Sequence, residues 1–403
     1  MYVLLLNAGS SSLKCTVLAA ADCKVIADSL TDWSGAVTHY RYAGPDGKQR
    51  SEDVSWKGYA PAVQRVLYDL THVEPVALSE RSALEAVGHR VVHGGQFTSS
   101  VRITPEIRSR IAALADLAPL HNRPSLDTLA AAQAELPGVP HVAVFDTAFH
   151  ATLPPEARTY PVPEKWTREW GIRRFGFHGL SHAYSSRRAA EMLGRPLEDL
   201  RLVICHLGGG CSDSAVHGGR CVATTMGFTP LDGLMMATRS GSIDPSIVLH
   251  VQQHHGLKPE QVEAALNHES GLLGVSGISG DMRSVLAAAR AGQPRAQLAF
   301  AMYTRRVRQA IGALAVTMGG IDALVFTAGV GEHSAEVREA VCAGLDCLGL
   351  ELDPQGNAAC RPDTDVSRRG SRGRILVIAT REDLTMLQDV IQVLDTKRNA
   401  MNP

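Results

Sequence analysis

The sequence has almost no excess charge, no long apolar run and no closely paired cysteines. Its 40 Lys and Arg residues nearly balance 41 Asp and Glu residues, for a formal net charge of −1. This balance argues against nucleic acid or an anionic membrane as the main partner. No apolar run is long enough to cross a bilayer, so we expect no membrane association. The opening segment MYVLLLNAG has no basic lead and is interpreted as a buried strand rather than a signal peptide.

The cysteines bear on the compartment. There are eight, none in a CxxC pair, and several lie in apolar surroundings. This pattern is typical of reduced, mostly structural thiols, so we expect a cytoplasmic protein.

The familiar phosphate-binding motifs are also missing. NAGSSSLK at 7–14 follows the apolar run YVLLL, and a strand that ends in such a turn can present backbone N–H groups to a phosphate. The stretch lacks the GxxxxGK[ST] spacing and has one glycine where GxGxxG needs three. Taken alone, it is better interpreted as a hairpin turn.

What the chain does have is an alternation of short apolar runs with longer helical patterns, which predicts an α/β protein. Its 403 residues exceed what one hydrophobic core usually serves, so we expect two domains. The predicted strands are 2–6, 13–18, 87–92, 141–145, 202–206, 322–327 and 375–379, and the predicted helices are 58–70, 125–135, 181–193, 296–318, 334–348 and 382–395.

The two halves of the chain open alike. The same pattern of a strand, a turn of small residues and a second strand occurs twice, as VLLLNAGSSSLKCTVL at 3–18 and as LVICHLGGGCSDSAVH at 202–217. A third strand and glycine turn, ALVFTAGVGEHS, follows at 323–334. The repetition predicts a duplicated domain with a cleft between the copies. Several glycine turns around a cleft suit a nucleoside triphosphate.

A set of longer motifs, spread over nearly the whole chain, resembles the acetate kinase family. This family includes propionate kinases and belongs to the superfamily of sugar kinases, Hsp70 and actin. The motifs are NAGSSSLK, GHRVVHGG, LAPLHN, FDTAFH, FGFHGLSH, HLGGGCS, TTMGFTPLDGLMMATRSGSIDP, GVSGISGDMR, FTAGVGEHS and TREDL.

The resemblance implies a fold and a reaction. The fold is a duplicated actin-like (ribonuclease H-like) two-domain α/β fold with an active-site cleft between the domains. An N-terminal domain of residues 1–149 with 384–403 and a nucleotide-binding domain of residues 150–383 are expected. The reaction is reversible transfer of the γ-phosphoryl group of ATP to acetate, giving ADP and acetyl phosphate, with Mg²⁺ or alternatively Mn²⁺. A homodimer is also implied.

The catalytic residues that the resemblance implies are mostly cationic or hydrogen-bond donors. This suits the chemistry, because the acetate carboxylate, with a pKa like that of Asp (about 3.9), is already ionised and must approach an anionic phosphoryl group. An isolated Arg more often forms a surface ion pair, and Asp146 could simply cap the next turn. If Asp146 is functional, we favour the interpretation that it orients an Arg side chain or Mg²⁺ over the interpretation that it removes a proton. The implied set is Arg90, His121, Asp146, His178 and Arg239.

The remaining implied residues bind the substrates and the metal. Asn7 and Glu382 are placed beside Mg²⁺, although an acidic residue in the first turn of a helix is also an ordinary partner of the helix dipole. A small pocket for the methyl group is assigned to Val92, Leu120, Phe177 and Pro230. The ATP set is Ser10, Ser12, Lys14, His206, Leu207, Gly208, Gly209, Gly210, Asp281, Met282, Arg283, Gly329, Val330, Gly331, Glu332 and His333.

Three positions depart from the usual family pattern: Gly209 replaces Asn, His333 replaces Asn, and Leu180 replaces Thr. The first two bear on the phosphoryl donor. Two rival functions also stand. Propionate kinase shares the same motifs, and a non-catalytic nucleotide switch of the actin or Hsp70 kind would share the fold. His182, four residues after His178, is assigned a structural place rather than a metal-binding one, because Gly179 makes a regular helix doubtful there.

Overall fold

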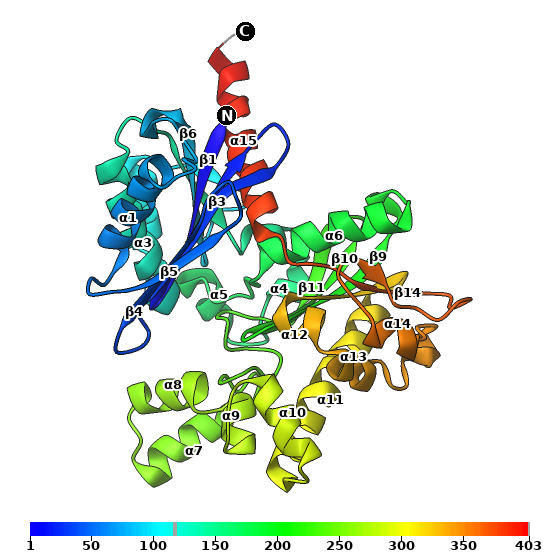
Figure 1. Ribbon diagram of the computed structural model, residues 1–403. Coiled ribbons are helices and arrows are strands. Elements are labelled where there is room, and N and C mark those ends of the chain that lie inside the picture. The colour runs from blue at the N-terminus through cyan, green and yellow to red at the C-terminus, as the bar shows by residue number, and fades with distance from the viewer. Residues whose placement is uncertain (116–118, 402–403) are drawn as a thin grey trace. The chain divides into compact units, whose positions relative to one another are not determined.

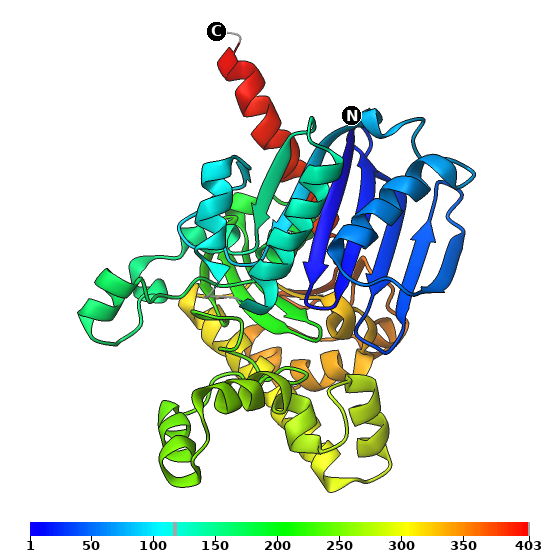
Figure 2. The same ribbon diagram turned by 90° about the vertical axis from the view of Figure 1, so that its left-hand side faces the viewer.

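The structure, a computed structural model, describes residues 1–115 and 119–401, without the side chains of 119–121 and 397–401. The chain divides into two compact units, Met1–Ala148 with Arg381–Pro403 and Phe149–Thr380. Each unit is built around its own mixed β-sheet (Figures 1 and 2). None of the helices in the described residues has the length and apolar character that a bilayer crossing would need.

The sheet of the first unit has the strand order β5-β4-β3-β2-β1-β6-β8-β7. Its first five strands form an antiparallel meander, and β1 then pairs in parallel with β6. The strands are β1 (Tyr2–Gly9), β2 (Ser12–Ala19), β3 (Lys24–Asp32), β4 (Thr38–Ala43), β5 (Gln49–Val54), β6 (Leu84–Val91), β7 (Val101–Arg102) and β8 (His141–Phe145).

Helices cover both faces of this sheet, as the coloured ribbon shows (Figure 1). Leu4 and Leu6 of β1 pack into one core with α1 (Tyr59–His72) and α3 (Pro119–Glu135). Successive strand residues point to opposite faces, so Leu5 lies on the other side, near Val390 of α15 (Glu382–Met401). This double burial explains why the first strand has an unbroken apolar run. The other helices of the unit are η1 (Arg81–Ala83) and α2 (Pro105–Ala112).

The sheet of the second unit has the order β11-β10-β9-β12-β14-β13. Here too an antiparallel meander leads into parallel strands, since β9 pairs antiparallel with β10 and parallel with β12. The strands are β9 (Arg201–Leu207), β10 (Cys211–His217), β11 (Arg220–Thr224), β12 (Ala323–Thr327), β13 (Thr364–Asp365) and β14 (Arg374–Val377).

Helices α6 (Gly179–Leu193) and α11 (Pro294–Thr317) cover opposite faces of the second sheet. Ala189 of α6 packs in one core with Ile204 and Val216, whereas Tyr303 of α11 is hydrogen-bonded to Cys211, which faces the other way. The remaining helices are η3 (Ala148–Thr152), α4 (Pro155–Arg158), α5 (Glu164–Trp170), η4 (Leu197–Asp199), α7 (Pro245–His255), α8 (Pro259–His268), α9 (Gly271–Ser276), α10 (Met282–Arg290), α12 (Ala328–His333), α13 (Ala335–Cys342), η5 (Leu345–Leu348) and α14 (Pro354–Ala358).

The predicted repetition is present in the backbone. Both β1–β2–β3 and β9–β10–β11 are antiparallel meanders that begin with a hairpin at the small-residue turn. Two local predictions were wrong. The predicted helix 334–348 ends at Cys342, because Gly344 has a φ of 84° and starts a separate 3-10 turn. Gly179, expected to disfavour a helix, is the first residue of α6.

Candidate active site

Four polar residues converge in the first unit, at the ends of neighbouring elements. Arg90 near the end of β6 donates two hydrogen bonds to Asp146, which directly follows β8 (Nε–Oδ1 3.1 Å, Nη2–Oδ2 2.6 Å). Its Nη1 donates to the amide oxygen of Asn7 in β1 at 3.1 Å. The Glu382 carboxylate, at the start of α15, lies 4.0 Å from Arg90 Nε. Because β1, β6 and β8 run parallel, residues near their carboxyl ends meet at one edge of the sheet.

The charge balance of this cluster holds Arg90 in its ionised form. Burial by itself lowers the pKa of the guanidinium, but the nearby Asp146 and Glu382 carboxylates outweigh that effect, so the pKa is raised. The Asp146 side chain is 1% exposed and grips the guanidinium with both oxygens. This bidentate contact fixes the plane of the guanidinium.

Ser10, Ser12 and Lys14 belong to the hairpin between β1 and β2. Gly9 pairs with Ser12 and Asn7 pairs with Lys14, so the connection is a tight two-residue turn. The Tyr59 hydroxyl donates to the carbonyl of Gly9 at 2.7 Å and braces the turn. The hairpin interpretation of this stretch is therefore correct for the backbone, and its predicted phosphate contacts stay a prediction.

In the second unit the turn between β9 and β10, Gly208–Gly210, lies against two of the predicted catalytic side chains. A Cβ placed on Gly210 would lie 3.3 Å from Nε2 of His178 and 3.6 Å from Nη1 of Arg239. The Gly209 carbonyl accepts a hydrogen bond from the N–H of Ala237 at 3.1 Å, which ties the segment leading to Arg239 to the turn. Glycine at 210 thus lets the backbone approach both side chains closely.

Arg239 is a cation without a carboxylate partner in the described part of the chain. Its Nη1 donates to the carbonyl of Pro230 at 3.1 Å and contacts the Met236 sulfur at 3.7 Å. Burial lowers the pKa of its guanidinium, and the Cys211 thiol offsets this only in part. A partly buried guanidinium beside a glycine turn is suited to an anionic ligand.

His178 occupies a strained position at the start of α6. Its φ is 57° and its ψ 25°, a left-handed conformation that is uncommon outside glycine. The imidazole stacks on that of His206, with ring centroids 4.1 Å apart, and its Nδ1 lies 2.9 Å from the Ser212 hydroxyl. Such strain is characteristic of functional sites.

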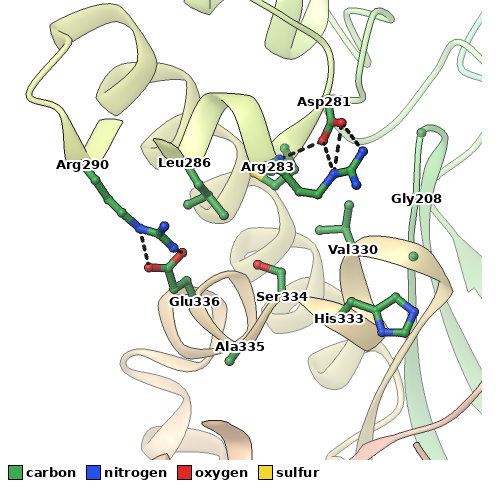
Figure 3. A pocket seen from close by; sticks show the side chains of 13 residues that line it. Gly208, Asp281, Arg283, Leu286, Arg290, Val330, His333, Ser334, Ala335 and Glu336 are labelled. Atoms are coloured by element: carbon green, nitrogen blue, oxygen red, sulfur yellow. Dashed lines mark hydrogen bonds and ion pairs between the residues drawn. The ribbon is translucent and has the colours of Figure 1, made fainter. Parts of the chain in front are cut away.

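A cavity of about 840 Å³ opens beside the same glycine turn (Figure 3). Gly208 and Gly209 form one wall, α10 another, and the stretch from Gly329 to Glu336 the third. At its edges Arg283 pairs with Asp281 and Arg290 pairs with Glu336. Of the predicted ATP residues, the cavity is lined by Gly208, Gly209, Asp281, Met282, Arg283, Gly329, Val330 and His333.

Other predicted ATP residues of this unit do not line the cavity. The Glu332 carboxylate accepts hydrogen bonds from the N–H and the hydroxyl of Thr380, at 2.9 and 2.7 Å, and so fixes α12 to the end of β14. Gly331 and Leu207 are buried, and His206 is hydrogen-bonded to Ser181 at 2.8 Å. These positions support the walls of the cavity.

The residues predicted for the methyl pocket belong to both units. Val92 is 6% exposed in the first unit, and Phe177 is 1% exposed in the second, where the carbonyl of Pro230 also contacts Arg239. The side chains of Leu120 and His121 lie outside the described residues.

The sequence did not point to five of the cavity residues. Met282, Leu286 and Arg290 recur every four residues along α10, so the helical spacing could have extended the DMR motif to the whole face. The FTAGVGEHS motif reaches Ser334, between α12 and α13, but no comparable signal marked Ala335 and Glu336 at the start of α13. The residues missed are Leu286, Arg290, Ser334, Ala335 and Glu336.

These features define a class of protein: a phosphotransferase on a duplicated α/β fold, with a glycine turn, two cationic or donor side chains and a nucleoside-sized cavity. Comparison with known proteins identifies the family. The acetokinase family model matches residues 2–388. The acetate kinase of Trichormus variabilis is 45% identical over 405 residues, which cover 98% of this chain and 100% of that protein.

Solved structures give the same result. The acetate kinase of Porphyromonas gingivalis has a TM-score of 0.91 at 36% identity, covering 98% of this chain and 99% of that one. A propionate kinase from Francisella tularensis has a TM-score of 0.90 at 35% identity, covering 97% and 99%. The chain belongs to the acetokinase family. It is an enzyme, a phosphotransferase with a carboxyl group as acceptor, and its fold is the duplicated actin-like two-domain fold that the sequence predicted.

Proposed function

We propose that this chain transfers the γ-phosphoryl group of ATP reversibly to acetate, giving ADP and acetyl phosphate. The observation that carries the proposal is the Arg239 guanidinium, which lies without a carboxylate partner, among the described residues, beside the Gly208–Gly210 turn and Nε2 of His178. An acetate oxygen attacks the γ-phosphorus, while the bond between the γ-phosphorus and the oxygen that bridges the β- and γ-phosphates breaks. Negative charge spreads over the phosphoryl oxygens, and Arg239 and His178 donate to them.

Asp146 serves this reaction by holding Arg90, not by removing a proton. Acetate is already ionised at neutral pH, with a pKa of about 4 by analogy with Asp and Glu, so the transfer to acetate needs no base. The two hydrogen bonds from Arg90 to Asp146 leave the guanidinium in one orientation. Arg90 then offers a fixed positive charge to the carboxylate or the phosphoryl group.

The oxygen donors in the first unit fit Mg²⁺. Asn7 offers an amide oxygen and Glu382 a half-buried carboxylate, and Mg²⁺ takes one or two protein oxygens together with waters and substrate phosphates. These two residues would hold the ion, with Mn²⁺ as an alternative. When bound, the ion would neutralise phosphate charge.

The cavity of the second unit is the proposed site for the adenosine part of ATP. Its volume of about 840 Å³ is within the range of small-molecule pockets. The Arg283 side chain is 91% exposed, so its ion pair with Asp281 is weak. Arg283 can therefore leave this ion pair and stack on the adenine ring. Gly208 and Gly209 lead from this cavity toward the phosphates.

A hydroxamate assay tests the function, with MgATP and acetate, propionate or butyrate in turn. We expect acyl phosphate with the highest kcat/KM for acetate. A higher kcat/KM for propionate would make the chain a propionate kinase, a second candidate that the Francisella tularensis structure supports. One methylene changes discrimination by only about 1–3 kcal/mol, so the ratio must be measured. ATP binding without any acyl phosphate would point to a nucleotide switch.

Replacing Gly209 with Asn should strengthen ATP binding. A Cβ at Gly209 would meet no atom within 4 Å, and the residue has no positive φ, so the side chain fits without strain. An amide that donates to a charged phosphate should lower the KM for ATP about tenfold. Steady-state kinetics would check this, with Gly209→Ala as the control that adds the Cβ alone. An unchanged KM in the Asn variant would show that position 209 does not face the phosphates.

Two wider features are also proposed on the family resemblance: a homodimer and a cytoplasmic location. Light scattering after size-exclusion chromatography would give the oligomeric state directly.

A further inference from the structure

The Ser212 hydroxyl, in β10, lies between two imidazoles: that of His178, the N-cap residue of α6, and that of His182, within α6. Its Oγ is 2.9 Å from Nδ1 of His178 and 2.8 Å from Nε2 of His182. Ser212 and His182 are both 0% exposed. The three side chains therefore form a chain of hydrogen bonds in which Ser212 and His182 are closed off from water and His178 is partly exposed.

The protons of this chain can be assigned by counting. Ser212 has one hydroxyl proton, and among the described residues the hydrogen-bond partners of its oxygen are the two imidazoles. The proton must therefore go to one of them, and that ring nitrogen must be unprotonated. The other ring then donates its own N–H to the serine oxygen.

The far side of His182 decides the direction. Its Nδ1 is buried and has no hydrogen-bond partner in the part of the chain that the structure describes. A buried N–H without an acceptor costs more than a lone pair without a donor, so Nδ1 carries no proton and Nε2 does. The titratable groups that face this ring are His150 and His206. Burial first, and then the proximity of these two imidazoles, lowers the pKa of His182 well below its ordinary value, so the ring is neutral.

We propose that His182 and Ser212 are positioning residues that hold His178 in the Nε2–H form, ready to donate to the transferring phosphoryl group. His182 Nε2–H donates to Ser212, and Ser212 O–H donates to Nδ1 of His178. The remaining proton of His178 is then on Nε2, the atom that lies beside Gly210, the residue that Arg239 Nη1 also approaches. The role at the phosphoryl group rests on the proposed kinase function, whereas the proton assignment does not.

The opposite assignment would work against catalysis. With the proton on Nδ1, His178 would present the lone pair of Nε2 to the phosphoryl oxygens, which carry negative charge. A donor would become a repulsive contact at the point where charge develops. A second imidazole and a serine hydroxyl thus have a function that their spacing in the sequence does not reveal.

The proton assignment can be read directly by ¹⁵N NMR of protein labelled at histidine. The His178 signals are identified by their loss in His178→Gln. We expect the Nε2–H form of His178 and of His182 in the wild type. A spectrum in which His178 is protonated on Nδ1 alone would overturn the proposal, whatever the enzymatic activity.

Kinetics then test whether the assignment matters. Ser212→Ala should lower kcat about 10- to 100-fold, by analogy with the loss found when the hydrogen-bond partner of a metal-ligating histidine is removed, with little change in KM. Ser214→Ala is the matched control, because Ser214 is on the same strand, is equally buried and is hydrogen-bonded to Thr224 rather than to a histidine. We expect this control to leave kcat unchanged. Equal kcat values for the wild type and Ser212→Ala would refute the positioning role.

A pair of variants at His182 separates positioning from packing. His182→Gln keeps an amide N–H near the place of Nε2 and should retain most of kcat, whereas His182→Met fills the space without a donor and should resemble Ser212→Ala. Equal losses in both would show that only packing matters. If no variant, including the wild type, makes acyl phosphate while NMR finds His178 with Nε2–H, the kinase function fails and the proton assignment stands.

Discussion

Replacing Arg239 with Ala should lower kcat for acyl phosphate formation about 10²- to 10³-fold, the usual effect of removing one donor to a developing charge. The guanidinium has no carboxylate partner among the described residues, and its protein contacts are a carbonyl oxygen and a thioether. Its charge is therefore available to the phosphoryl oxygens. Activity would be measured with saturating ATP and acetate, beside Arg239→Lys, which keeps the charge but loses the planar fork.

Although Arg239→Ala should lose activity, we expect it to be at least as stable as the wild type. Burial lowers the pKa of Arg239, so the folded chain bears a cost for holding this cation without an anion. Arg239→Ala should unfold at a temperature no lower than the wild type. The control is Arg368→Ala, which removes an exposed arginine paired with Glu351 and should leave kcat unaltered. A full kcat in Arg239→Ala would remove this residue from the site.

The sequence predicted the fold well where strand and turn signals coincide. The apolar runs at β1 and β9 are each followed by small residues that close a hairpin, and the repeated pattern indicated the duplication. The prediction was wrong where the end of a helix depends on the backbone angle of a single residue. Apolar spacing continued past Cys342, but Gly344 adopts a positive φ and ends the helical path.

The site was predictable only in part. A motif identifies individual residues, whereas the chemistry depends on contacts between residues that lie far apart in the sequence. Arg90 and Asp146 are 56 positions apart, and their pairing follows from the parallel register of β6 and β8. Ser212 could not be found in this way. Its role depends on which face of β10 meets α6, and a serine in a strand has no pattern of its own.

The Arg90–Asp146 pair offers the second large effect. Asp146→Asn should lower kcat about 100-fold, because it loosens the guanidinium that the two carboxylate oxygens hold. It should also reduce the free energy of unfolding by about 3 kcal/mol, since it leaves a largely buried arginine with the Asn7 amide and, as a counter-charge, the more distant Glu382. Glu135→Gln, in the less buried pair with Arg81 of the same unit, should cost less than about 1 kcal/mol and leave kcat intact.

The same variants separate positioning by Asp146 from proton transfer. If Asp146 acts only through Arg90, the double variant Arg90→Gln with Asp146→Asn should be no slower than Arg90→Gln alone. The profile of kcat/KM against pH should also keep its shape in Asp146→Asn between about pH 6 and 9, because acetate is ionised throughout this range. An additive double variant, or a profile that loses its acid limb, would instead make Asp146 a base in its own right. Since a carboxylate nucleophile leaves no proton to remove, we expect the non-additive result.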